Sequence, residues 1–383
     1  MRQEGKNAAL ILYVPLNHGG RWCAVGFPRT FSFPWWFCQT AYPLMKFTLI
    51  LAIALAFATP IFSHEGHDHA SGVGNVITTA TVTGPEGHQF VTAPGWGSLP
   101  KEKNIGPLHG DLAVVKSGNV YVSLESKAGI AVFDRHGKFI KTLKPGLQQL
   151  HSLIAIEENG KEFLWGAQVK QNRAVKVDLE GNIVSTLPNE KTGDLEGGMG
   201  GLTEVLVGPK GHIYFFMGYG SKKIHKLKPD GTLVKTYGGK GKGKDQFTAC
   251  HGAAMDYRYD EPRILVCDRD GRRMMHLTLD LTWIGIYGTT PMRRPADVDV
   301  QGDYAAVGEI EGRVILMDKE GKVVAALLDN PNEKQWATNG VPAHQLHDNA
   351  FSAPHGIKWG PQGQIYVSEY SKVGRLIALF PKK

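Results

Sequence analysis

A unit of four short apolar runs recurs along the chain, and this repetition constrains the fold more than any other feature of the sequence. The clearest copy spans residues 109–143, and polar, glycine-containing breaks at 116–119 and 134–137 separate its apolar runs. Runs of this length and composition are typical of short strands, and the breaks between them are typical of tight turns. The other five copies begin at His151, Leu202, His251, Pro295 and His355. Six repeated four-stranded units predict a radial array of blades.

The predicted fold is therefore all-β, a six-bladed β-propeller of four-stranded antiparallel blades. The sixth copy ends at 380–383 without a fourth strand, so we expect the N-terminal segment 89–93 to supply that strand and close the ring. The 47 Gly and 21 Pro residues suit a fold with many turns. Because closure couples the two ends of the repeat region, we expect one domain, with loops between blades at 187–201 and 328–350.

The segment before the repeats has the pattern of an export signal. Met45 and Lys46 precede an apolar run over 47–57, and the small residue Ser63 ends the segment. The run is too short to cross a bilayer as a helix, which needs about 20 residues; a buried core helix is the alternative interpretation. The expected segments are an upstream extension outside the natural protein, which starts at Met45 (1–44), a signal peptide (45–63), a histidine-rich N-terminus with the closing strand (64–104) and the propeller (105–383). The mature protein is then secreted or periplasmic, with no stable membrane span.

The formal net charge of +7 does not indicate a nucleic-acid partner. Five Lys or Arg residues and one Glu precede His64, so the remainder of the chain carries a net charge of only +3. A nucleic-acid-binding domain usually shows a much stronger basic excess. We expect a monomer that binds no nucleic acid.

Two cysteines follow the predicted signal peptide. Cys250 and Cys267 flank a predicted hairpin with its turn near 260–262, so a disulfide between the two strands is geometrically possible in an exported protein. Two free, buried thiols are the alternative.

Histidine stands at the start of the innermost predicted strand in four copies, as His109, His151, His251 and His355. Blades of a six-fold ring lie about 60° apart, so residues of the second, fourth and sixth blades approach the axis from directions about 120° apart. His151, His251 and His355 thus form a trigonal set. Three imidazoles with an open fourth position are a catalytic zinc arrangement, and a purely structural ring of histidines is the alternative. His109 breaks the alternation, and we interpret it as a residue behind the ligands or facing a substrate.

These residues also carry a family resemblance. The repeats resemble NHL repeats, and residues from about 105 to 380 resemble the catalytic domain of peptidyl-α-hydroxyglycine α-amidating lyase, a six-bladed propeller with zinc on three axial histidines. The histidine motifs of that family match His151 in LHSL, His251 in CHGA and His355 in PHGI. Its catalytic tyrosine matches Tyr219 in FMGYG, and its substrate-binding arginine matches Arg269 in CDRDGR. The resemblance implies a zinc-dependent lyase acting on a small-molecule or peptide ligand in the axial channel.

Three positions depart from the family pattern. The family's second active-site arginine falls near 122–125, where this chain has no Arg. The aspartate after the last zinc histidine, a calcium ligand in the family, is Gly356 here, which leaves calcium binding open. The cysteine after the catalytic tyrosine is Gly220, so that family disulfide is absent. These departures imply a retained metal centre with an altered substrate site.

The expected chemistry follows from the residue types. Tyr219 near a metal ion can act as a general acid or base, with its usual pKa of about 10 lowered by the ion. Arg269, beside Asp268, can hold a carboxylate through its planar guanidinium. The alternatives are a core tyrosine with a hydrogen-bonded hydroxyl and an arginine paired with Asp268 or with an acid of a neighbouring blade.

Two other functions compete with the lyase. Propellers of this kind also serve as non-catalytic modules that bind a protein or a small molecule. A gluconolactonase-like hydrolase has six blades as well, but it uses carboxylate and asparagine ligands around calcium. The histidine set disfavours that hydrolase.

Overall fold

The computed structural model describes residues 11–15, 22–26, 77–100, 105–143, 146–289 and 291–383. The chain divides into two units, Met1–Ser63 and His64–Lys383. In the first unit, β1 (Ile11–Pro15) and β2 (Trp22–Gly26) pair antiparallel. The sequence of residues 1–44, which lacks strand periodicity, did not predict this pair. The predicted signal peptide lies outside the described residues.

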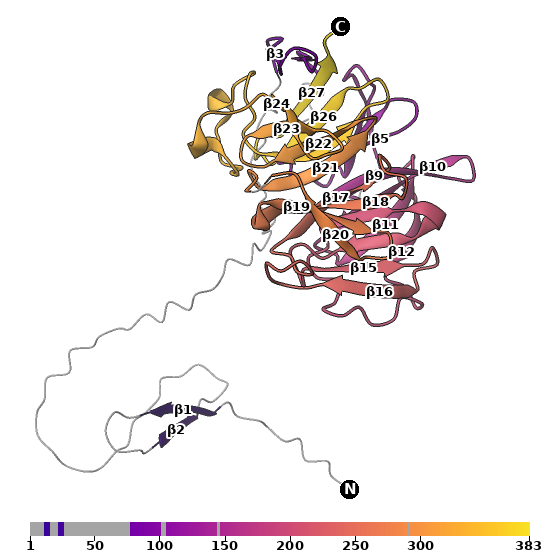
Figure 1. Ribbon diagram of the computed structural model, residues 1–383, viewed down its shortest axis with the longest axis vertical. Coiled ribbons are helices and arrows are strands. Elements are labelled where there is room, and N and C mark those ends of the chain that lie inside the picture. Colours follow the sequence, from indigo (N-terminus) through magenta and orange to yellow (C-terminus); the bar gives the residue numbers. More distant parts are fainter. Residues whose placement is uncertain (1–10, 16–21, 27–76, 101–104, 144–145, 290) are drawn as a thin grey trace, which may run out of the picture. The chain divides into compact units, whose positions relative to one another are not determined.

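Six antiparallel sheets make up the described part of the second unit, which confirms the predicted all-β propeller (Figure 1). Blade 1 contains β5 (Leu112–Val114), β6 (Val120–Ser123), β7 (Ile130–Phe133) and β8 (Phe139–Thr142). Blade 2 contains β9 (Leu150–Glu158), β10 (Lys161–Gln168), β11 (Arg173–Asp178) and β12 (Ile183–Leu187). Blade 3 contains β13 (Glu204–Val207), β14 (Ile213–Phe216), β15 (Lys223–Leu227) and β16 (Leu233–Gly238).

The remaining blades follow the same plan. Blade 4 contains β17 (Cys250–Asp256), β18 (Arg263–Asp268), β19 (Arg273–Thr278) and β20 (Trp283–Tyr287). Blade 5 contains β21 (Pro295–Gln301), β22 (Tyr304–Glu309), β23 (Arg313–Met317) and β24 (Val323–Leu327). Blade 6 contains β25 (Pro354–Trp359), β26 (Ile365–Glu369) and β27 (Arg375–Pro381), and it is completed from the N-terminal side by β4 (Phe90–Thr92) and the short β3 (Val82–Thr83).

Closure of the ring occurs as predicted, because the N-terminal strand β4 pairs antiparallel with β27. The register places Leu379 opposite Thr92 and Phe380 opposite Val91. The first strands of the six blades contact one another in a closed circuit, in the order β5, β9, β13, β17, β21, β25 and back to β5. These six strands therefore line the central axis, and residues near their starts face a common channel. The loops at 187–201 and 328–350 lie between blades, as expected.

The turn between the third and fourth strands recurs for a local chemical reason. In blade 1, one carboxylate oxygen of Asp134 accepts hydrogen bonds from the backbone N–H groups of His136, at 2.8 Å, and Lys138, at 2.9 Å. The turn reaches Gly137 with a φ of 84°, a left-handed conformation that costs glycine little. The same Asp-x-x-Gly pattern closes the hairpins at 178–181 and 318–321. These turns let four strands follow one another with almost no connecting chain.

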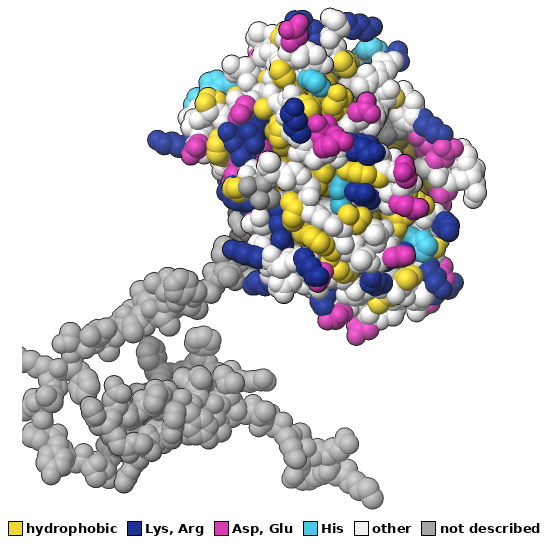
Figure 2. Space-filling view, viewed as in Figure 1, with side chains coloured by type: hydrophobic (Ala, Val, Ile, Leu, Met, Phe, Trp, Pro, Cys, Tyr) yellow, Lys and Arg dark blue, Asp and Glu magenta, His cyan; other side chains and the backbone are white. Residues whose placement is uncertain are grey.

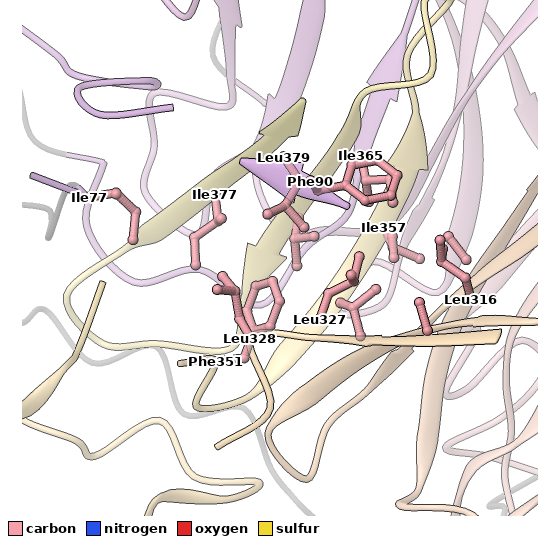
Figure 3. Close-up of a cluster of buried hydrophobic side chains, with 14 residues drawn as sticks. Ile77, Phe90, Leu316, Leu327, Leu328, Phe351, Ile357, Ile365, Ile377 and Leu379 are labelled. Atoms are coloured by element: carbon pink, nitrogen blue, oxygen red, sulfur yellow. The ribbon is translucent and has the colours of Figure 1, made fainter. Parts of the chain in front are cut away.

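The hydrophobic core lies between neighbouring blades rather than at the axis. Figure 3 shows the cluster between blades 5 and 6, where Leu316 and Leu327 face Ile357 and Leu379. Equivalent clusters fill the spaces between the other pairs of blades. Phe90 of the closing strand lies in the cluster of Figure 3 and is only 6% exposed.

Replacing Phe90 with alanine should therefore destabilise the whole propeller. Truncating a buried phenylalanine typically costs about 3–5 kcal/mol, through lost apolar burial and the cavity left behind. The matched control is Ile140→Ala on the outer strand of blade 1, where the side chain is 47% exposed and the expected loss is below about 1 kcal/mol. Urea unfolding followed by circular dichroism measures both changes. Equal effects of the two variants would show that the closing strand contributes little to stability.

Both cysteines of the propeller are free and buried, so the structure supports the alternative of two free thiols. Cys250 pairs in register with Asp268, the neighbour of Cys267, and the two thiols consequently lie on opposite faces of blade 4. Cys250 belongs to the core between blades 3 and 4, whereas Cys267 belongs to the core between blades 4 and 5. A disulfide would need both sulfur atoms on one face.

The thiols should be unreactive until the protein unfolds. Burial raises the pKa of the Cys250 thiol to about 12 and that of Cys267 well above its ordinary value, so both remain protonated at pH 8. Folded protein starting at His64 should not react with Ellman's reagent at pH 8, and two thiols should react in guanidinium chloride without reductant. Absence of reaction after unfolding would indicate a disulfide.

The visible surface of the propeller mixes charges of both signs. Figure 2 shows Lys and Arg interspersed with Asp and Glu over this face, without a large patch of one sign. The described residues include no helix long and apolar enough to cross a membrane.

Candidate metal centre

Four histidines converge in the axial channel from different blades. His151, His251 and His355 each occupy the second position of the first strand of their blade, in β9, β17 and β25. His109 lies three residues before β5. All four are at most 9% exposed. The repeat therefore delivers an imidazole to the axis at each position that the sequence singled out.

The imidazoles are in mutual contact. The ring of His355 lies with its centroid 4.7 Å from His109, 4.8 Å from His151 and 5.0 Å from His251. His151 and His251 lie 4.7 Å apart. Among the described residues, His109, His151 and His355 form a group that could hold a metal ion, with one ligand nitrogen from each residue and these atoms all within 4.8 Å of one another. This group contains His109, where the sequence interpretation expected His251.

Backbone carbonyls fix the tautomers of two histidines. Nδ1 of His151 lies 2.8 Å from the carbonyl oxygen of Thr203, and Nδ1 of His251 lies 2.7 Å from that of Ala296. A carbonyl can only accept, so each Nδ1 carries the proton and each Nε2 presents a lone pair to the channel. Burial, with repulsion from Arg269, also holds the pKa of His251 well below its ordinary value. Neutral imidazoles oriented by a carbonyl at the far nitrogen are characteristic metal ligands.

The hydroxyl of Tyr219 lies where these lone pairs meet. Its oxygen is 2.9 Å from Nε2 of both His151 and His251 and 3.3 Å from Nε2 of His109. Tyr219 follows β14 in the turn that leads to β15. A hydroxyl has one proton and can donate to one of these nitrogens at a time. The same point suits a cation that several lone pairs approach at once, so the donor set fits a divalent metal.

Arg269 lies beside this tyrosine. It is 9% exposed, belongs to the short 3-10 turn η2 (Arg269–Gly271), and donates from Nη1 to the Tyr219 hydroxyl at 3.3 Å. Its other guanidinium nitrogens donate to the two carboxylate oxygens of Asp270, at 3.2 and 3.3 Å. Burial raises the pKa of Tyr219, and the positive charge of Arg269 opposes this rise. The predicted catalytic pair is therefore assembled next to the histidines.

Asp268 has a structural position rather than one facing the channel. One carboxylate oxygen accepts hydrogen bonds from the backbone N–H groups of Thr248, at 2.7 Å, and Ala249, at 2.8 Å. The other accepts from Nε of Arg273 at 2.8 Å. The alternative interpretation, in which Arg269 pairs with Asp268, does not hold, because Asp270 takes that role and Asp268 instead anchors the chain just before His251.

A hollow between blades 1 and 2 adjoins the histidines. Its lining includes His109, Glu125, His151 and Lys170. Glu125 belongs to the segment 122–125, near which the resembling family has its second active-site arginine. Its carboxylate lies 3.8 Å from Nδ1 of His109. Burial raises the pKa of Glu125, while the ammonium of Lys170 opposes the rise. The two charged side chains give this hollow a polar wall beside the imidazoles.

A layer of carboxylates, not anticipated from the sequence, lies against the histidine layer. Asp111, Glu204 and Asp297 line one small cavity together with His151, His251 and His355. We call these three acids the carboxylate layer. They come from blades 1, 3 and 5, whereas the three histidines come from blades 2, 4 and 6. The signal was present in the repeat, since Glu204 and Asp297 directly follow the positions where copies three and five lack histidine.

Lys358 of β25 reaches into the carboxylate layer. Its ammonium group lies 2.7 Å from Oδ2 of Asp111 and 3.0 Å from Oδ2 of Asp297. Burial raises the pKa of Asp111 to about 8, with Lys358 acting against the rise, and burial likewise raises that of Glu204 well above its ordinary value. The layer therefore holds three acids beside one ammonium group, and burial favours the protonated form of Asp111 and Glu204.

The glycines after two of the histidines are required by this layer. A Cβ on Gly356 would lie 2.5 Å from Oδ1 of Asp111, and a Cβ on Gly252 would lie 2.7 Å from Oδ1 of Asp297. Such contacts are far below van der Waals separation, so no other residue fits without movement of the chain. The family's calcium-binding aspartate, which would stand at Gly356, is excluded here because Asp111 occupies that space.

Comparison with known proteins supports the fold alone. No family model matches the chain, and no curated protein matches it in sequence. A gluconolactonase from Xanthomonas campestris superimposes with a TM-score of 0.54 at 11% identity, covering 82% of this chain and 99% of that one. A structure named provisionally as a gluconolactonase gives 0.53 at 13% identity, with 79% and 98% covered. A virginiamycin B lyase from Staphylococcus aureus gives 0.48 at 16% identity, with 73% and 96% covered.

Proposed function

We propose that this protein is an exported, monomeric, metal-dependent enzyme whose axial histidines hold a divalent ion, with zinc the best fit to the donor set. The observation that carries the proposal is the meeting of several imidazole nitrogens with the hydroxyl of Tyr219, itself bonded to Arg269. The ligands would be His151, His251 and His355. Carbonyl anchoring of His151 and His251 supports this set, while the nitrogen separations support His109 as the third ligand in place of His251.

The reaction class that suits these groups is a lyase similar to peptidyl-α-hydroxyglycine α-amidating lyase, with a different substrate site. In that reaction the α-carbon to nitrogen bond breaks and its electron pair goes to nitrogen. The substrate hydroxyl loses its proton as the carbonyl of glyoxylate forms, and the nitrogen gains one, so no oxidant or reductant is needed. A divalent ion supplies Lewis acidity to a substrate oxygen at such a site.

The side chains of this chain would handle the proton and the substrate's charge. Tyr219 lies within hydrogen-bond distance of three imidazole nitrogens and of Arg269, so it can exchange a proton with a substrate group at the same point. Arg269 would hold an anionic group of the substrate near that hydroxyl. Asp270, which pairs with both Arg269 and Arg294, keeps the guanidinium in place.

Metal analysis followed by a product assay tests the proposal. Protein starting at His64, purified without a histidine tag, should contain about one zinc per chain, in keeping with a single site of this type. It should release glyoxylate from a peptide ending in α-hydroxyglycine, lose that activity on chelation and regain it with zinc. If the protein binds metal but releases no glyoxylate, the proposed metal site would stand and this lyase activity would be rejected.

A non-catalytic propeller that binds a protein or small molecule is the second candidate. The observation that favours it is the Tyr219 hydroxyl itself, which already lies at the point that an ion would share with the imidazoles. If the protein takes up no zinc even after reconstitution, the result would favour this non-catalytic function over the metal-dependent enzyme. Uptake of zinc would show that the Tyr219 hydroxyl moves away from the position that the ion shares with the imidazoles.

A further inference from the structure

The carboxylate layer has the composition of a cation site. The cation that it contains is the ammonium group of Lys358. Lys358 is 9% exposed, and its ammonium group has three acceptors within reach: Asp111 at 2.7 Å, Asp297 at 3.0 Å and the carbonyl oxygen of Ile357 at 3.1 Å. An ammonium has three protons, so these contacts use its full donor capacity. The side chain is thus held as an ion would be.

The acids around Lys358 retain unused acceptor capacity. Oδ1 of Asp297 is buried and lacks a hydrogen-bond partner, while the side chain lines the axial cavity and is only 6% exposed. Glu204, 2% exposed, has one oxygen bonded to the backbone N–H of Val205 at 2.8 Å and lies in the wall of the same cavity. Two acids therefore contact the ammonium group, and a third lies in the wall of the same cavity. A buried carboxylate oxygen without a donor points to a ligand of higher charge.

The charge balance explains why lysine is tolerated at the axis. Burial opposes the charge of Lys358, yet the carboxylates of Asp111 and Asp297 outweigh burial and raise its pKa well above the ordinary value. The ammonium stays charged because the acids of blades 1 and 5 converge on it. This is the electrostatic environment of a bound cation rather than that of an ordinary surface lysine.

We propose that the carboxylate layer is a cation site occupied by the ammonium group of Lys358, and that it binds a divalent, oxygen-ligated cation such as Ca²⁺ once that group is removed. In the wild-type protein the lysine excludes such an ion and leaves the neighbouring imidazoles as the place for a metal. Carboxylate oxygens are the ligands that Ca²⁺ prefers, whereas imidazole suits zinc and similar ions. Calcium therefore reports on the carboxylate layer separately from the histidines.

Calcium binding to metal-free Lys358→Met tests the proposal. Methionine keeps much of the length of the side chain without its charge, so the acids lose their cation and the melting temperature should fall. Millimolar CaCl₂ should then raise the melting temperature of this variant by about 5 °C, as expected when ligand is near 100 times its Kd. Isothermal titration calorimetry should give about one Ca²⁺ per chain. Wild-type protein and the matched control Lys228→Met, at an exposed lysine, should show neither effect.

Two results would overturn the proposal: no effect of Ca²⁺ on Lys358→Met, or an equal effect of Ca²⁺ on the wild-type protein. The double variant Lys358→Met/Asp297→Asn should lose most of the calcium response. If Lys358→Met is insoluble, refolding becomes the readout; recovery that depends on Ca²⁺ supports the site, and failure with or without Ca²⁺ contradicts it. These readouts require neither zinc nor catalysis, so they stand apart from the proposed lyase function.

Discussion

Changing His151 or His355 to alanine should reduce zinc affinity by a factor of at least about 100, because both residues belong to either ligand set and two imidazoles make a poor zinc site. His355 contacts the other three imidazoles, and the tautomer of His151 is fixed by the carbonyl of Thr203. Competition with a chromogenic zinc chelator measures the affinity of each purified variant. The circular dichroism spectrum should not change, since neither side chain belongs to a hydrophobic cluster.

The control for this series is His344→Ala, which removes an exposed imidazole in the turn η4 (Ala343–Gln345) and should leave zinc binding unchanged. His251→Ala and His109→Ala then identify the third ligand. Loss of zinc from His251→Ala alone would support the set from blades 2, 4 and 6. Loss from His109→Ala alone would assign the third position to His109, in line with the nitrogen separations. If every variant kept its zinc, the axial site would be rejected.

Tyr219→Phe should retain the metal and lower turnover by a factor of about 10²–10⁴, the usual contribution of a positioned acid or base. The phenyl ring keeps the aromatic contacts with His151 and His251, whose ring centroids lie 5.0 and 5.3 Å from that of Tyr219. The hydroxyl is lost, together with its contacts with the three imidazole nitrogens and with Arg269. Steady-state release of glyoxylate, with zinc content measured on the same samples, checks the expectation.

Tyr257→Phe provides the matched control, because Tyr257 is 60% exposed and belongs to no part of the site. It should turn over substrate like the wild type. Unchanged turnover in Tyr219→Phe would remove the tyrosine from the catalytic scheme. Loss of zinc from Tyr219→Phe would instead make its oxygen a ligand.

The fold could be predicted from the sequence because a pattern of short apolar strands separated by tight turns recurs from blade to blade. Short apolar strands are local signals that recur in six copies, with Asp-x-x-Gly turns in three of them, and this repetition leaves few alternatives to a ring. Even the strand around Val91 could be anticipated, since the last copy lacks one strand and an open edge must be covered. The short β3 could not be anticipated, because two paired residues carry no distinctive pattern.

The site was only partly predictable, for reasons of geometry. Repeat positions show which blades send histidines to the axis, but the conformation of each side chain decides which nitrogens come together, and this brought His109 into the group. The partner of Arg269 depended on the turn η2, whose shape presents Asp270 instead of Asp268. The buried position of Lys358 was not predicted, because a lysine within a strand is ordinarily expected to face the solvent. Only the assembled ring shows that acids of blades 1 and 5 meet there.

The pairing of β4 with β27 also determines when this domain can be completed. Val91 and Phe380 are among the first and last residues of the propeller to leave the ribosome, so their contact cannot form until synthesis of the blades is finished. The five blades made before that moment can form their own sheets, but β4 must wait with an unpaired edge until β27 has been made. Contacts between such distant residues are slow to form because a long chain must first be brought together. A nascent or trimmed chain without either strand therefore exposes an adhesive β edge, and quality-control proteases and chaperones recognise such chains by exposed surfaces of this kind.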